Sequence, residues 1–130
     1  RAGRMNVAYI DTSSLVAIAF GEAGGQALAR RLDAMDRLFA SNLLEAELRA
    51  TFVRERVPAD HPLLGRITWV LPDRPLGREI GVVLGAGYLR GADLWHLACA
   101  LYLAGNPRDL PLITLDERQE VVARKLGFPG

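Results

Sequence analysis

Apolar and polar residues follow two patterns along the chain. One is typical of short buried strands, and the other is typical of helices. Four segments have strand character: residues 7–10, 37–41, 67–71 and 110–116. Six segments have helical character: residues 11–21, 26–35, 42–56, 77–84, 92–104 and 117–127. Because strands and helices alternate without hairpin turns, we predict an α/β sandwich with a mainly parallel sheet.

Length and composition fit one globular domain. The chain has 130 residues, of which 50% are hydrophobic and 24% are charged, as in soluble single domains. We expect this domain to cover residues 5–130. Residues 1–4, which precede Met5, resemble the remnant of an expression tag, and His61 is expected in an exposed loop.

Net charge gives no general attraction to nucleic acid. The formal charge is +1, and without Arg1 and Arg4 fourteen basic residues face fifteen acidic ones, which gives −1. Binding to phosphates would therefore need a local basic cluster or a bound metal ion. Lys125 is the sole lysine, so the other basic side chains are arginines.

Cysteine content and hydropathy indicate the cellular setting. Cys99 is the single cysteine, so an internal disulfide and a cysteine zinc cluster are excluded, and a reducing compartment is expected. The longest apolar run, residues 94–104, contains His96 and is shorter than the ~20 residues that span a bilayer. We therefore expect a cytoplasmic protein without a membrane partner.

Acidic residues directly follow two of the predicted strands. Asp11 ends the sequence VAYID, and Asp116 ends LITLD. In open parallel sheets, sites lie at the carboxyl ends of strands, but aspartate is also a preferred helix cap. Asp93, at the start of the helix 92–104, has the same two interpretations: a plain cap or a functional carboxylate.

The predicted helix 42–56 contains two glutamates that cannot share a face. Its apolar stripe consists of Leu43, Leu44, Leu48, Thr51 and Phe52. Glu47 lies on this stripe, whereas Glu45 points away and can pair with Arg49 one turn later. An inward carboxylate needs a partner or a metal. Glu47 is therefore a candidate ligand; the alternatives are a salt bridge to an arginine and an edge position in a wet groove.

Four acids, Asp11, Glu47, Asp93 and Asp116, are thus expected at one rim of the sheet. Carboxylates packed together repel one another unless a divalent cation holds them. Ligand sets made only of oxygen favour Mg²⁺ or Mn²⁺ over Zn²⁺. Such ions activate water and screen phosphate charge in the hydrolysis of phosphodiesters. The pattern therefore favours nuclease chemistry.

Four stretches of the chain resemble, in the same order, the signature stretches of PIN-domain ribonucleases, particularly the VapC-like toxins of bacterial toxin–antitoxin pairs. They are YIDTSSLVA, SNLLEAEL, GADLWHLACAL and LITLDERQEVVARKLGF. The resemblance implies that Asp11, Glu47, Asp93 and Asp116 are the catalytic, metal-binding acids, with His96 in support. It further implies a three-layer α/β/α sandwich with a PIN-like fold, Mg²⁺- or Mn²⁺-dependent RNA cleavage, a homodimer, and inhibition by a cognate antitoxin whose tail occupies the groove. The family's last edge strand would be missing or very short here.

Other polar residues near these acids have two interpretations each. Thr12, Ser13 and Thr114 flank the acids and could bind metal-bound water or the scissile phosphate, although capping accounts for them equally well. Three arginines, Arg49, Arg54 and Arg56, could line an RNA groove or simply form a solvated helix face. His96, between two leucines on a helix, is expected from the residues alone to be a packed, hydrogen-bonded side chain.

The leading hypothesis is therefore a metal-dependent endoribonuclease of toxin type. A PIN-like scaffold that binds RNA or a partner without cutting is the second hypothesis. A phospho-receiver domain, which shares the sheet and the strand-end aspartates, is the third. Receiver chemistry needs a lysine near the acids, and Lys125 lies in the last predicted helix, which argues against it.

Overall fold

The computed structural model describes residues 5–58 and 62–130. The expected tag remnant at residues 1–4 and the predicted loop residue His61 lie outside the described residues. The sheet has four parallel strands in the order β3-β2-β1-β4. Their bounds are β1 (Val7–Ile10), β2 (Arg37–Ser41), β3 (Ile67–Val70) and β4 (Leu112–Ile113). The parallel sheet agrees with the prediction, but β4 is much shorter than the predicted segment 110–116.

Helices connect the strands and form the two outer layers. The α-helices are α1 (Thr12–Ala19), α2 (Gly25–Asp33), α3 (Asn42–Glu55), α4 (Gly77–Ala86), α5 (Gly91–Leu103) and α6 (Glu117–Leu126). Two short 3₁₀ helices are η1 (Pro62–Arg66) and η2 (Pro107–Asp109). None of the helices within the described ranges is both long and apolar enough to span a membrane.

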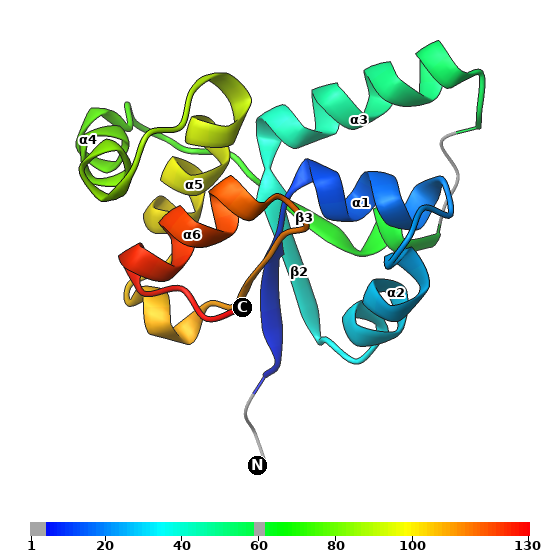
Figure 1. Cartoon of the computed structure of the whole chain (residues 1–130), viewed down its shortest axis with the longest axis horizontal. Helices are drawn as coiled ribbons and strands as arrows, with labels where there is room; N and C mark the ends of the chain where they lie inside the picture. The colour runs from blue at the N-terminus through cyan, green and yellow to red at the C-terminus, as the bar shows by residue number, and fades with distance from the viewer. Residues whose placement is uncertain (1–4, 59–61) are drawn as a thin grey trace.

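The sheet separates two hydrophobic clusters, which makes the fold the predicted three-layer sandwich. Helices α1, α2 and α3 cover one face, and α4, α5 and α6 cover the other (Figure 1). Successive residues of β1 point to opposite faces: Ala8 and Ile10 pack with the first group, and Tyr9 packs with the second. All three are fully buried, because a central strand is covered on both sides.

Three helices follow a strand at the carboxyl edge of the sheet, α6 after a three-residue connection from β4, and each is capped by the residue that precedes it. Asp11 caps α1, Ser41 caps α3 and Asp116 caps α6. In each case the side-chain oxygen accepts a hydrogen bond from the backbone N–H three residues later, which satisfies a donor that the helix leaves free. The caps therefore bring polar side chains from three strand ends to one edge.

The last residues of the chain lie beside the outer edge of β4. The backbone N–H of Leu112 donates to the carbonyl oxygen of Pro129 at 2.7 Å. This single contact is all that corresponds to a further edge strand in the described residues, where no fifth strand is present. The sequence expectation of a missing or very short edge strand agrees with this arrangement.

An ion pair connects the segment between β3 and α4 to helix α4. The Arg74 guanidinium donates to both carboxylate oxygens of Glu79 and lies over the Tyr102 ring, with 5.1 Å from Cζ to the ring centroid. Glu79 is only 4% exposed. The hydrogen bonds from Arg74 outweigh the effect of burial and lower the pKa of Glu79 to about 2.

Glu79→Gln should lower the free energy of unfolding at neutral pH, and the difference should shrink as the pH falls below the ordinary pKa of a glutamate. Because the pKa of Glu79 in the folded protein is below the ordinary value of about 4.3, the pair stabilises the fold above that ordinary value. The stabilisation is lost as the pH falls toward 2. Urea unfolding of both proteins between about pH 7 and about pH 3 measures the difference. Glu22→Gln, at an exposed glutamate, is the control; a pH-independent difference for Glu79→Gln would contradict the assignment.

Candidate functional site

Asp11 is buried at the end of β1, with 1% of its surface exposed. Its Oδ1 accepts hydrogen bonds from the Ser14 N–H at 3.1 Å and from the Ser13 hydroxyl at 2.9 Å. Its Oδ2 accepts from the Thr114 hydroxyl at 2.6 Å and from Ser13 at 2.9 Å. Asp11 is thus a helix cap, as one interpretation held, but the hydroxyl of Thr114 also ties it to the end of β4.

Thr114 continues the connection from β1 to the start of α6. Its hydroxyl oxygen accepts a hydrogen bond from the backbone N–H of Asp116 at 3.0 Å. The Ser13 hydroxyl oxygen accepts from the Leu115 N–H at 3.0 Å. The flanking hydroxyls therefore position the carboxylate of Asp11 and the β4–α6 connection at the same time.

Glu47 lies on α3 beside the end of β2 and faces α1 and α5. Its Oε1 accepts from the Thr12 hydroxyl at 2.8 Å and contacts His96 Nε2 at 2.9 Å. Its side chain is 34% exposed. Glu47 therefore takes the wet-groove position that the sequence left open as an alternative, and its partners are a threonine and a histidine rather than an arginine.

His96 connects Glu47 to the cap of α3. Its Nδ1 lies 2.6 Å from the Ser41 hydroxyl oxygen, which also accepts the Leu44 N–H at 3.2 Å. Because a carboxylate only accepts, His96 Nε2 donates to Glu47. In the neutral imidazole Nδ1 then accepts the hydroxyl proton of Ser41, and every polar atom of the chain Leu44–Ser41–His96–Glu47 is satisfied.

Burial of His96 confirms the expectation of a packed, hydrogen-bonded side chain. The residue is 1% exposed, and its carbonyl oxygen accepts a hydrogen bond from the Tyr9 hydroxyl at 2.6 Å. Burial is the main cause that raises the pKa of Tyr9 well above its ordinary value, so this hydroxyl remains a donor. The bond fixes α5 to the central strand at the turn that carries the Asp93 and His96 side chains.

Asp93 and Asp116 share one partner, Gln119 of α6. The Gln119 side-chain amide Nε2 donates to Asp93 Oδ1 at 3.0 Å, and the Gln119 backbone N–H donates to Asp116 Oδ1 at 2.9 Å. Asp93 is not a helix cap, and that interpretation was wrong. Helix α5 begins at Gly91, whose left-handed φ of 56° suits glycine, so Asp93 falls within the first turn.

Three of the acids act electrostatically on the fourth, Asp93. The pKa of Asp93 is raised, first by burial and then by the negative charges of Asp116, Asp11 and Glu47, while His96 acts in the opposite direction. Across residues 5–58 and 62–130, no three acidic, histidine or cysteine side chains converge closely enough to form a ready ligand set for an ion. The donors nevertheless fit a hard divalent cation, because all four are carboxylates whose repulsion a cation would relieve.

Comparison with known protein families gives one match. The model of the PIN domain family matches residues 8–125, a range that includes all four acids. The chain belongs to the PIN domain family. No curated protein and no solved structure gives a significant match. Family membership agrees with the sandwich fold and suggests nuclease activity.

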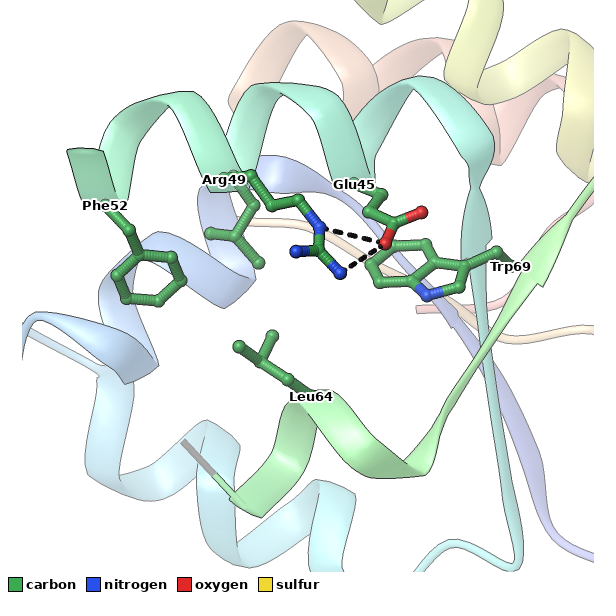
Figure 2. Close-up of a pocket in the computed structure, with 6 residues that line it drawn as sticks. Glu45, Arg49, Phe52, Leu64 and Trp69 are labelled. Atoms are coloured by element: carbon green, nitrogen blue, oxygen red, sulfur yellow. Dashed lines mark hydrogen bonds and ion pairs between the residues drawn. The ribbon is translucent and has the colours of Figure 1, made fainter. Parts of the chain in front are cut away.

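The opposite side of α3 in this PIN domain carries Glu45, as predicted. Its carboxylate pairs with Arg49 at 2.9 Å (Figure 2). The pair borders a pocket of about 100 Å³ whose lining consists of Glu45, Leu48, Arg49, Phe52, Leu64 and Trp69. Glu45 therefore has a surface partner, and Glu47 has the contacts to α1 and α5.

One residue assigned to the apolar stripe of α3 is not buried. Leu43 is 37% exposed, whereas Leu44, Leu48 and Phe52 are buried. Leu43 precedes Glu47 by one helical turn, so both lie on the same edge of the stripe, beside the acids rather than in the core. The prediction of a buried Leu43 was wrong for this reason.

The arginines of α3 have different surroundings. Arg49 pairs with Glu45, and Arg54 pairs with Glu55 at 3.0 Å. Arg56 ends the helix in a left-handed conformation with φ of 57°. A role of these three residues in binding RNA stays a prediction.

Gln119 was not recognised in the sequence as a residue of the site. Its position three residues after Asp116 predicts the backbone bond of a helix cap. The contact of its side chain with Asp93 depends on how α5 packs against α6, and no sequence spacing encodes it. The preference of buried amides for polar partners is the only signal that could have drawn attention to it.

Ser41→Ala should lower the free energy of unfolding by about 2–4 kcal/mol, because it removes the α3 cap and leaves the buried Nδ1 of His96 without a partner. Thr51→Ala is the matched control. The Thr51 hydroxyl donates only to the Glu47 carbonyl of its own helix, so a change within about 0.5 kcal/mol is expected. Urea unfolding measures both variants. Equal effects of the two substitutions would contradict the role of Ser41.

Proposed function

We propose that this PIN domain is a metal-dependent endoribonuclease that hydrolyses RNA phosphodiester bonds with Mg²⁺ or Mn²⁺. The observation that carries the proposal is that four carboxylates from different parts of the chain lie at one edge of the sheet, where burial and the charges of Asp116, Asp11 and Glu47 raise the pKa of Asp93. A solvated surface would not need to crowd four negative charges. A site that holds a divalent cation would.

The ligands of the cation would be Asp11, Glu47, Asp93 and Asp116. When bound, the cation supplies activation of water and screening of the phosphate charge. The protein contributes orientation: hydroxyls of Ser13 and Thr114 hold Asp11. Thr12 and His96 hold Glu47 through Oε1, which leaves Oε2 directed to the groove in this proposal.

Thr12, Ser13 and Thr114 act in this proposal through the carboxylates that they contact. Each hydroxyl donates its proton to Asp11 or Glu47, so it fixes a ligand rather than attacks the substrate. Contact of their oxygen atoms with the scissile phosphate or with water on the cation remains part of the proposal. Arg49, Arg54 and Arg56 are the proposed contacts to the RNA backbone, and Arg56 has no ion pair in the described part of the chain.

The biological setting is proposed from the resemblance to VapC-like toxins. The domain would act in the cytoplasm as the toxin of a toxin–antitoxin pair and form a homodimer. A cognate antitoxin would inhibit it by placing its tail in the groove beside the four acids. Leu43, exposed on the groove edge one turn before Glu47, offers apolar surface for such a tail.

The alternative is a PIN-like scaffold that binds RNA or a partner without cutting it. The absence of a ready ligand set among the described residues favours this alternative. The two functions differ in a measurable property, because a scaffold needs neither the carboxylate charges nor a divalent ion to bind RNA.

Glu47→Gln should lower the Mn²⁺-dependent rate of RNA cleavage by at least about 10²-fold, which corresponds to a few kcal/mol of lost stabilisation of the transition state. The amide oxygen can still accept from Thr12 and His96, so the fold should persist. Glu45→Gln removes the same charge from the opposite side of α3 and should change the rate less than about twofold.

Cleavage of a labelled single-stranded RNA by both variants, with folding checked by circular dichroism, measures the contrast. Similar cleavage rates for Glu47→Gln and the wild type would contradict the proposal. A similar loss in both variants would show that the charge on α3, and not the position of Glu47, matters.

A further inference from the structure

Gln119 is a buried amide with one unsatisfied end. The residue is 3% exposed, and its Oε1 is the one fully buried side-chain oxygen or nitrogen in the described residues that lacks a hydrogen-bond partner. Buried polar atoms are nearly always paired, because an unpaired one loses its water without compensation. The amide is therefore kept at this position despite an energetic cost.

The orientation of the amide follows from its neighbour. The carboxylate of Asp93 can only accept hydrogen bonds when ionised, so the Nε2 end of Gln119 must face it. Rotation of the amide by a half-turn would bring Oε1 against the Asp93 carboxylate, where two oxygens would face each other without a donor between them. The observed orientation therefore satisfies Asp93 and leaves Oε1 without a partner.

We propose that Gln119 is a positioning residue that sets the distance between Asp93 and Asp116. Its side chain holds Asp93 of α5, and its backbone N–H holds Asp116 at the start of α6. Each bond goes to the Oδ1 atom of its own aspartate. Within the part of the chain that the structure describes, no hydrogen bond reaches Oδ2 of either aspartate, which leaves these two oxygens for a divalent cation.

The other two acids are held by separate partners, which supports this assignment. Hydroxyls of Ser13 and Thr114 fix Asp11, and Thr12 with His96 fixes Glu47. Among the described residues, Gln119 alone donates hydrogen bonds to the carboxylates of two of the four acids. This inference rests on the proposed function, because the free oxygens matter only if a cation binds there.

The effect of Gln119→Met depends on whether the amide is purely structural or positions Asp93. Methionine has a similar length and no polar group that must be satisfied, so it removes the unpaired oxygen together with the bond to Asp93. Asp93 is partly exposed and can take a water instead. Stability in the absence of metal should therefore be equal or higher, while affinity for the cation falls.

The experiment measures three properties of the full chain: the dissociation constant for Mn²⁺ by titration calorimetry, the thermal unfolding midpoint in EDTA, and Mn²⁺-dependent RNA cleavage. For Gln119→Met we expect weaker Mn²⁺ binding by about 10–100-fold, the usual effect of removing a residue that holds a ligating side chain. The unfolding midpoint should not fall. Gln26→Met, at an exposed position of α2, is the matched control and should leave all three unchanged.

Each outcome decides the inference. Unchanged Mn²⁺ affinity in folded Gln119→Met, with a wild type that binds Mn²⁺ and cuts RNA, overturns the role of Gln119 and leaves the proposed function standing. A wild type that neither binds Mn²⁺ nor cuts RNA removes both. If Gln119→Met does not fold, Gln119→Leu is measured in its place, and failure of both to fold would make the amide a structural requirement and overturn the inference.

Discussion

Repulsion between four carboxylates at the carboxyl edge of the sheet is the constraint on which the rest of the site depends. The charges of Asp116, Asp11 and Glu47 add to burial in raising the pKa of Asp93. Each acid is held by donors that belong to a neighbouring element, such as Thr114 of the β4 end for Asp11 and α6 for Asp93. The hydrogen bonds that stabilise the edge of the sandwich are thus the same bonds that keep like charges close together.

Helix capping and ligand function coexist in this domain. Asp11 and Asp116 each accept a backbone N–H at the start of a helix, so the simple structural explanation of both residues is correct. It does not compete with a functional one, because a carboxylate has more lone pairs than one cap uses. Parallel strands make the coincidence possible: their carboxyl ends share one edge, where the helices begin.

Sequence alone predicted the fold and much of the site because these depend on local pattern. The continuous apolar run 7–10, the helical stripe of 42–56 and the strand-end aspartates follow from period and position, and helical geometry distinguished Glu47 from Glu45. The length of β4, the exposure of Leu43 and the place of Asp93 in the first turn of α5 depend on tertiary packing. So does Gln119, whose contact with Asp93 joins residues that are 26 positions apart.

The central claim is that the strand-end carboxylate Asp11 belongs to a metal-dependent nuclease site. Cleavage of single-stranded RNA by wild type and Asp11→Asn, with Mn²⁺, Mg²⁺ or EDTA, tests it most directly, since the charge is removed while the asparagine oxygen can still cap α1. The account predicts discrete fragments from the wild type with either metal. It predicts none in EDTA and none from a folded Asp11→Asn. Equal cleavage by the two proteins would contradict the claim, and so would no cleavage by the wild type with either metal, a result that would favour the binding scaffold.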